Sequence, residues 1–156
     1  MKKILVIMLI AVFAMLALTA CSGGEGGDII DDSASEVTLY ANGGTIWMGT
    51  DDLYDADLST SSIDKDTVFK DAIDPIDSVK KDGAEFNGWK VYIVTEGEWT
   101  QEEPADLEDG HLVVPCGDYG YYYMKDYEIA DENATTEELM GYKASGKDYY
   151  ALATWK

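Results

Sequence analysis

The first twenty-one residues limit how much of this chain can take part in a fold. Lys2 and Lys3 precede an almost purely apolar run from residue 4 to residue 20, and Cys21 follows it. A basic start followed by such a run is typical of a secretory signal peptide, which is removed and forms no part of the folded domain. We therefore expect residues 1–20 to be a signal peptide in this 156-residue chain.

The end of this run carries a specific motif. The quartet Leu18, Thr19, Ala20 and Cys21 resembles the bacterial lipobox, in which signal peptidase cuts before the cysteine and a diacylglyceryl group is attached to its sulfur. The alternatives are an ordinary signal peptide or an uncleaved membrane helix, although an apolar run of this length is at the lower limit for spanning a bilayer. We expect an extracytoplasmic lipoprotein that is anchored to the bacterial cell membrane or envelope through Cys21.

The charge of the chain excludes two classes of partner. It has 31 acidic residues against 11 lysines and no arginine, for a net charge of −20. Nucleic-acid binding and polybasic attachment to anionic lipid both need a basic surface, so neither is expected. The expected partners are the membrane, through the Cys21 lipid, and an unknown extracellular protein or glycan.

Lipidation of Cys21 would leave Cys116 as the one free thiol. An intramolecular disulfide and a cysteine-based zinc site are then both impossible. Cys116 follows the apolar run 112–114, so we expect a buried, inert thiol at a strand end. A reactive thiol or an intermolecular bridge is the alternative.

The remaining chain reads as a flexible acidic Gly/Ser tether at 21–35 and a single domain at 36–156. Alternating apolar residues predict strands at 37–41, 45–48, 85–94, 111–114, 121–129 and 148–155. Asn42-Gly43-Gly44 predicts a hairpin turn between the first two strands. We expect a helical segment over about 66–82 and irregular loops at 49–62 and 95–110. A capping box at 135–138 predicts a short helix through about residue 144.

Three segments resemble the Listeria–Bacteroides repeat, also called the internalin B-repeat. They are the opening strand with its Asn-Gly-Gly turn, a Gly-x-x-Phe-x-Gly-Trp segment and a closing Leu-x-Ala-x-Trp strand. The matching positions are Asn42, Gly43, Gly44, Gly83, Phe86, Gly88, Trp89 and Trp155. The resemblance implies an α+β, β-grasp-like mixed sheet with one short helix packed on it. It also implies surface display with a binding or stalk role, and it does not imply catalysis.

The chain departs from this repeat in two ways. Ala84 stands where members usually have an aromatic residue, and the chain is much longer than a repeat. The extra residues would be insertions at about 46–74 and 95–147 on a β-grasp-like scaffold, or they would belong to a different sheet arrangement. Because function often lies in loops that are added to a scaffold, we expect the specific function to lie in these insertions.

Catalysis has little support in the sequence. His111 is the only histidine, and no arginine is available for a phosphate clamp. A pair of carboxylates for glycoside hydrolysis could be chosen in many ways among 31 acids, so no particular pair is informative. We expect no enzyme activity and no cofactor.

Aromatic and acidic residues provide the candidate binding surfaces. We predict a ligand surface at Tyr119, Tyr121, Tyr123 and Trp99, and strand alternation places Tyr121, Tyr123 and Tyr127 on the face opposite Tyr122. The alternative is that these tyrosines only fill a sheet. The calcium candidates are Glu102, Glu103, Asp106 and Asp109. For that loop, the alternative is a solvated acidic segment.

The sequence thus favours a lipid-anchored, non-enzymatic interaction or adhesion module. The alternative is an extracytoplasmic lipoprotein that binds a small ligand, a glycan or calcium through its acidic and tyrosine-rich insertions.

Overall fold

The computed structural model describes residues 34–156. The expected signal peptide, the lipobox with Cys21 and nearly all of the tether lie outside this range and stay predictions. Within it, no helix is long and apolar enough to cross a membrane.

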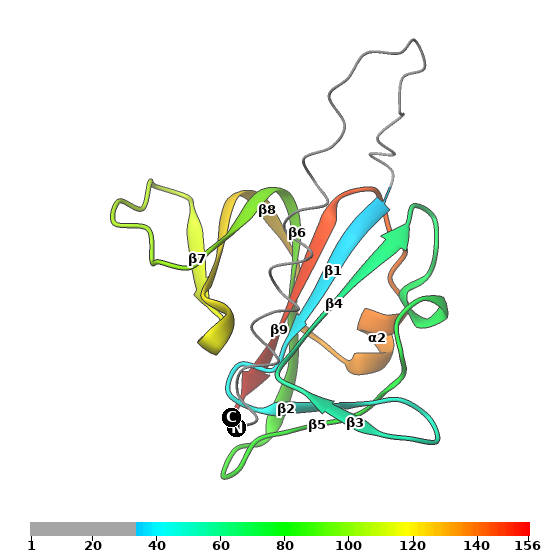
Figure 1. Ribbon diagram of the computed structural model, residues 1–156. Helices are drawn as coiled ribbons and strands as arrows, with labels where there is room; N and C mark the ends of the chain where they lie inside the picture. The colour runs from blue at the N-terminus through cyan, green and yellow to red at the C-terminus, as the bar shows by residue number, and fades with distance from the viewer. Residues whose placement is uncertain (1–33) are drawn as a thin grey trace, which may run out of the picture. The chain divides into compact units, whose positions relative to one another are not determined.

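The described chain consists mainly of strands, with one short α-helix and two 3₁₀ turns (Figure 1). The strands are β1 (Ala34–Tyr40), β2 (Thr45–Met48), β3 (Tyr54–Ala56), β4 (Leu58–Asp64), β5 (Ile76–Lys80), β6 (Phe86–Thr100), β7 (Leu112–Pro115), β8 (Tyr121–Ala134) and β9 (Asp148–Trp155). The helical elements are η1 (Phe69–Asp71), η2 (Gly117–Tyr119) and α2 (Thr136–Met140). This content is that of an α+β protein.

The strands form two sheets. The larger has six strands in the order β4-β1-β9-β6-β8-β7, and the smaller has three in the order β3-β2-β5. In the larger sheet, β1 and β9 run parallel and every other neighbouring pair is antiparallel. The first and last strands of the domain therefore lie side by side in the middle of this sheet (Figure 1).

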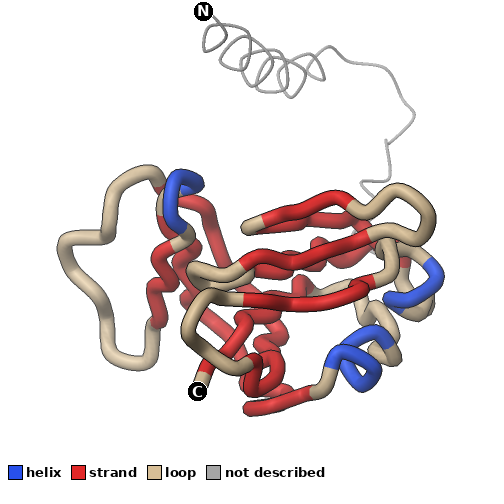
Figure 2. Tube along the Cα trace, turned by 90° about the horizontal axis from the view of Figure 1, so that it is seen from below, coloured by secondary structure: helices blue, strands red, loops and turns tan. Residues whose placement is uncertain are grey.

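The main core lies on one face of the six-stranded sheet. Side chains of β1, β6 and β9 pack there against β2, η1 and α2, with Trp89, Ile46, Phe69 and Leu139 fully buried. The small sheet, η1 and α2 can cover this face because the chain leaves the large sheet at the turn 42–44 and continues into β2 of the small sheet. Figure 2 shows that η1 and α2 lie at one end of the molecule and η2 at the other.

A second apolar cluster lies on the opposite face and depends on two bulges. Thr95 is the extra residue on β6, between the pairs Val94↔Tyr127 and Glu96↔Asp126. Lys125 is the extra residue on β8, between Glu96↔Asp126 and Gly97↔Met124. Bulges bend a strand and increase its twist. The ends of β6 and β8, with β7, thus carry Tyr122 and Val114 into one cluster with Tyr40, Tyr92 and Tyr150.

The predicted helical segment at 66–82 is wrong. Only Phe69–Asp71 is helical, and Ile76–Lys80 is the strand β5. Val79 pairs with Ile46 of β2, and both Ile76 and Val79 pack on the main core. Pairing with β2 thus decides the conformation of a segment whose Asp-Pro start is typical of a helix.

Three further predictions are corrected by the pairing of the strands. The return strand β2 does not pair with β1, because it joins β3 and β5, so residues 42–44 connect two sheets. The segment 49–62 is not an irregular loop, since it contains β3 and most of β4. The loop predicted at 95–110 begins only after Thr100, where β6 ends. The sequence of β4 is polar because β4 is an edge strand, and Ile63 is its one buried apolar residue.

The predicted helix after residue 135 is present but shorter than expected. Its capping box is complete: the Thr135 hydroxyl accepts from the Glu138 backbone N–H at 3.1 Å, and the Glu138 carboxylate accepts from the Thr135 N–H at 2.8 Å. The helix α2 ends at Met140, one turn before residue 144.

Candidate binding pocket and aromatic face

The three family-like segments meet at one end of the large sheet. The Trp155 indole N–H donates to the carbonyl oxygen of Asn42 at 3.1 Å, and the Asn42 side-chain amide donates to the Ala153 carbonyl at 3.0 Å. The Phe86 ring lies 5.8 Å from the Trp155 ring and 5.5 Å from the Trp89 ring, with edge-to-face geometry in both pairs. These residues therefore hold β1, β6 and β9 together, which is a structural role.

The glycines of these segments allow close approach. A methyl group on Gly44 would lie 2.6 Å from the Lys80 carbonyl oxygen and 2.8 Å from Cη2 of Trp155. Gly88 has a φ of 118°, and a Cβ there would lie 3.0 Å from two carbonyl oxygens of β8, those of Asn133 and Ala134. Gly83 has a φ of 74° in the turn between β5 and β6, and a Cβ there would meet no atom within 4 Å, so its backbone conformation and not a close approach favours glycine.

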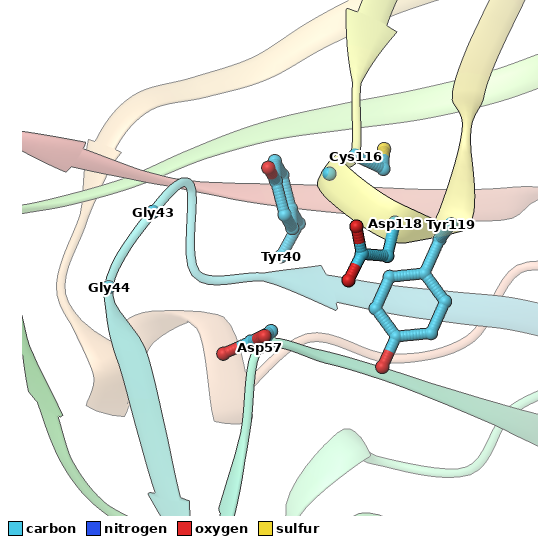
Figure 3. A pocket seen from close by; sticks show the side chains of 8 residues that line it. Tyr40, Gly43, Gly44, Asp57, Cys116, Asp118 and Tyr119 are labelled. Atoms are coloured by element: carbon cyan, nitrogen blue, oxygen red, sulfur yellow. The ribbon is translucent and has the colours of Figure 1, made fainter. Parts of the chain in front are cut away.

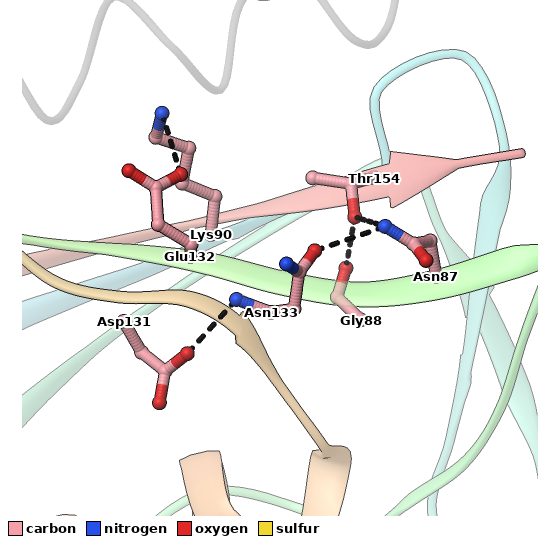
Figure 4. A network of polar contacts seen from close by, with 7 residues as sticks. All are labelled: Asn87, Gly88, Lys90, Asp131, Glu132, Asn133 and Thr154. Atoms are coloured by element: carbon pink, nitrogen blue, oxygen red, sulfur yellow. Dashed lines mark hydrogen bonds and ion pairs between the residues drawn. The ribbon is translucent and has the colours of Figure 1, made fainter.

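A polar network beside Gly88 ties three strands together (Figure 4). The Asn87 amide donates to the Asn133 side chain at 2.9 Å and lies 3.4 Å from the Thr154 hydroxyl. The Thr154 hydroxyl in turn donates to the Gly88 carbonyl at 2.9 Å. The side-chain amides and the hydroxyl of this network are hydrogen-bonded to one another and to the backbone. We therefore assign the network to the scaffold and not to a binding site.

A pocket of about 330 Å³ lies between the turn that follows β1 and the turn that contains η2 (Figure 3). Its lining consists of Tyr40, Gly43, Gly44, Asp57, Cys116, Gly117, Asp118 and Tyr119. Each wall comes from a different part of the chain. Tyr40 ends β1, Asp57 connects β3 to β4, and residues 116–119 connect β7 to β8.

Local backbone bonds hold these walls in place. The Ala41 N–H donates to the Asp57 carbonyl at 2.8 Å, which fixes the start of β4 beside the end of β1. The Cys116 N–H donates to the Gly120 carbonyl at 2.8 Å and closes the turn that presents Asp118 and Tyr119. Gly117 and Gly120 have φ values of 59° and 91°, so glycine is the residue suited to both positions.

The side chains of the pocket are negative and aromatic. Asp57 and Asp118 are exposed, and within residues 34–156 neither carboxylate has a hydrogen bond or an ion pair. Tyr119 is 49 % exposed at the rim. Tyr40 is only 8 % exposed, but solvent reaches its hydroxyl, because Ser78 Oγ is the one buried side-chain polar atom without a partner in residues 34–156. Burial, followed by the nearby Cys116 and Asp57, raises the pKa of the Tyr40 phenol.

Cys116 is buried as expected, with 1 % exposure. Its Sγ lies 3.0 Å from the Tyr150 hydroxyl and 3.4 Å from the Val114 carbonyl oxygen. Burial raises the pKa of this thiol, although the contact with Tyr150 acts in the opposite direction. Since the thiolate is the reactive form, Cys116 is a poor nucleophile.

The residues of the predicted aromatic surface do not share one environment. Trp99 is 38 % exposed and packs on Tyr122, with ring centroids 4.8 Å apart. Tyr119 lies at the pocket rim, and Tyr121 is half-buried. Tyr123 is 8 % exposed. Of these four residues, only Trp99 and Tyr119 therefore offer substantial aromatic surface to a partner.

The predicted facing of Tyr127 is wrong. Its ring lies 5.7 Å from Tyr92, in the same cluster as Tyr122. The bulge at Lys125 shifts the alternation of β8 by one residue, so Tyr122 and Tyr127 reach the same face.

His111 is hydrogen-bonded through one of its ring nitrogens. Nδ1 is hydrogen-bonded to the Tyr123 hydroxyl, and Nε2 lies 3.9 Å from a Glu108 carboxylate oxygen. No serine or cysteine is hydrogen-bonded to this ring among the described residues. The geometry thus gives His111 a structural role.

The calcium candidates Glu102, Glu103, Asp106 and Asp109 are all exposed in the loop between β6 and β7. In the part of the chain that the structure covers, no three His, Cys, Asp or Glu side chains are grouped to hold a metal ion.

Sequence reasoning did not select Tyr40, Asp57 or Asp118. The one available signal was the spacing Gly117-Asp118-Tyr119-Gly120, because two glycines around an acid and an aromatic residue mark a tight, exposed turn. Nothing in the sequence places this turn beside residues 40 and 57, which lie about 80 and about 60 positions earlier in the chain.

No protein-family model, curated protein or solved structure matches this chain significantly. The resemblance to the Listeria–Bacteroides repeat therefore rests on the residues quoted above, and the function has to be argued from the geometry of the site.

Proposed function

We propose that this protein is a lipid-anchored, extracytoplasmic bacterial surface protein that acts as a non-enzymatic interaction or adhesion module. Lipidation of Cys21 would supply the membrane anchor, and the described domain would bind the partner. One observation carries the proposal: the pocket presents two unpaired carboxylates and two tyrosines, which are groups suited to recognition.

We also propose that the domain is a β-grasp-like scaffold enlarged by insertions. Two observations support this proposal: the first and last strands are parallel neighbours, and the three family-like segments form one cluster. The expected insertions at 46–74 and 95–147 contain Asp57 and residues 116–119, while Tyr40 and Gly43-Gly44 belong to the scaffold. The pocket thus combines both insertions with a scaffold turn, as expected if the insertions carry the function.

Binding suits this pocket better than catalysis. Its one thiol is buried and has a raised pKa, and its carboxylates have no acid or base partner among the described residues. A covalent mechanism needs a nucleophile within reach of a base. His111, the only histidine, is not part of the pocket lining.

The test is adhesion of bacterial cells that display the full chain. We expect Tyr119→Ala to reduce attachment to extracellular-matrix proteins or glycan-coated surfaces by several-fold. Leu107→Ala is the matched control, because Leu107 is similarly exposed, at 53 %, in the acidic loop. Equal loss in both variants, or no attachment by wild-type cells to any surface tried, would argue against the proposal.

The second candidate is a lipoprotein that binds a small ligand, a glycan or calcium. The volume of the pocket favours a small ligand, since about 330 Å³ is within the range of small-molecule sites. Calcium is tested separately by the melting temperature of the full chain at millimolar calcium. A rise in melting temperature would support the calcium alternative, and an unchanged value would remove it.

A further inference from the structure

A second and larger pocket also borders the Gly43-Gly44 turn, and its charge is different. Its volume is about 430 Å³, and the rest of its lining consists of Thr45, Trp47, Lys80, Lys81 and Asp82. Apart from the two glycines, it shares no residue with the pocket beside η2. The lining thus holds two ammonium groups and one carboxylate, in a chain whose net charge is −20.

The indole of Trp47 lies on the outward face of the small sheet. Its neighbour Ile46 pairs with Val79, and both of these side chains pack on the main core. Because side chains alternate along a strand, Thr45, Trp47 and Lys80 lie on the opposite face. Trp47 is half-buried, and its N–H has no hydrogen-bond partner among the described residues. Packing in the core therefore does not account for this tryptophan, and its ring is available to a ligand.

The two lysines of the pocket are the second, independent observation. Neither ammonium group has an ion pair within residues 34–156. Lys81 Nζ lies 3.4 Å from the carbonyl oxygen of Asn42 and 5.6 Å from the centre of the Trp155 ring. These contacts hold the ammonium beside the turn and use one of its three N–H donors for a hydrogen bond. The remaining donors can bind an anion.

We propose that this second pocket binds a carboxylated sugar, such as a hexuronic acid residue of a glycan. The ammonium groups of Lys80 and Lys81 donate charge-assisted hydrogen bonds to the sugar carboxylate. The Trp47 indole covers the apolar face of the sugar ring, and the Asp82 carboxylate accepts from ring hydroxyls. This site is separate from the pocket beside η2, so the inference goes beyond the proposed function.

The lining distinguishes an acidic sugar from simpler ligands. A neutral sugar makes no use of the two ammonium groups, and an inorganic anion makes no use of the Trp47 ring. The two lysines and Asp82 together leave one positive charge, which one sugar carboxylate balances. A further carboxylate, that of Asp55, lies opposite Trp47 on β3 and outside the lining. The net charge of the chain thus disfavours a ligand with several negative charges.

The experiment is a saturation-transfer NMR titration of the detergent-solubilised full chain. The probes are methyl β-glucuronide, the neutral methyl β-glucoside and acetate. We expect the glucuronide to bind about tenfold more tightly than either other probe, because only the glucuronide combines the charge with the ring. Equal binding of acetate would show a site for simple anions, and equal binding of the glucoside would show that the lysines take no part. Either result would overturn the inference.

Three variants locate the site. Lys80→Gln/Lys81→Gln should weaken glucuronide binding about tenfold, because it removes both charged donors. Lys65→Gln/Lys147→Gln removes the same charge from exposed lysines outside the pocket and should leave the affinity unchanged. Trp47→Leu keeps an apolar side chain but removes the ring, so it should weaken the glucuronide severalfold and leave acetate unchanged.

Equal losses in the two lysine variants would show general attraction between an anion and the lysines of the surface, and would overturn the inference. Full glucuronide affinity in a Trp47→Leu variant that melts like wild type would also overturn it. The lysine variants change exposed side chains only, so the test does not depend on whether Trp47→Leu folds. Cell attachment does not enter this experiment, and its failure would leave the proposed function standing.

Discussion

The contact between Gly44 and Trp155 permits the sharpest test of the scaffold. In Gly44→Ala the new methyl group would lie 2.6 Å from the Lys80 carbonyl oxygen and 2.8 Å from Cη2 of Trp155. The φ of Gly44 is outside the left-handed region, so the cost is steric. Overpacking of this kind lowers the free energy of unfolding by about 3 kcal/mol when both the backbone and a large ring must move.

Gly83→Ala is the matched control. A Cβ at Gly83 meets no atom within 4 Å, but its φ of 74° is unfavourable for alanine. We expect Gly83→Ala to lower the free energy of unfolding by about 1 kcal/mol, because alanine is disfavoured in the left-handed conformation. The structure therefore predicts that Gly44→Ala lowers the free energy of unfolding by about 2 kcal/mol more than Gly83→Ala does. Both glycines belong to the family-like segments.

The assay is urea unfolding of the full chain, followed by tryptophan fluorescence and supported by melting temperatures. A loss of about 3 kcal/mol should lower the melting temperature by roughly 12 °C in a domain of this size. Adding Trp155→Leu to Gly44→Ala should recover about 1 kcal/mol of the steric cost, which a double-mutant cycle measures. The reasoning is refuted if Gly44→Ala costs no more than Gly83→Ala.

Four further results are expected. Thr135→Ala should lower the free energy of unfolding in urea by about 1 kcal/mol, because it removes the capping box of α2, and Thr50→Ala, at an exposed threonine with no side-chain hydrogen bond among the described residues, is the comparison. Burial raises the pKa of both Tyr122 and Tyr150, so the unfolded chain loses these protons first above pH 10 and stability should fall as pH rises further. Tyr150→Phe should flatten that slope, and an unchanged slope would show that this phenol contributes nothing. The Cys116 thiol should resist alkylation in the folded chain and react on unfolding, as measured by mass spectrometry. Cys21→Ala should leave the chain unlipidated and release it from the membrane fraction, and retention there would count against the lipobox assignment.

The strands with buried apolar residues could be predicted from the sequence. Alternation marks β1, the first part of β6 and β9, and the residues of the family-like segments do pack together in the structure. The segment 76–80 could not be predicted, because Asp74-Pro75 favours a helix start and only pairing with β2 makes it a strand. The strand β4 was missed because an edge strand with one buried apolar residue shows no alternation.

The pocket could not be predicted for a similar reason. Its residues come from three turns, and the bulges at Thr95 and Lys125, which bend β6 and β8, leave no sequence signal. The bulge at Lys125 also places Tyr127 on the same face of β8 as Tyr122, whereas strand alternation predicts opposite faces. Aromatic density indicated the right region around Tyr119, but the partners of that region depend on the long-range fold.

The most direct test of the account is attachment of bacterial cells that display the full chain, compared between two double variants that remove the same charge. Asp57→Asn/Asp118→Asn changes the pocket, and Asp106→Asn/Asp109→Asn changes the acidic loop between β6 and β7. The account predicts that the pocket variant loses attachment severalfold and that the loop variant attaches like wild type. Equal attachment by the two variants would contradict it.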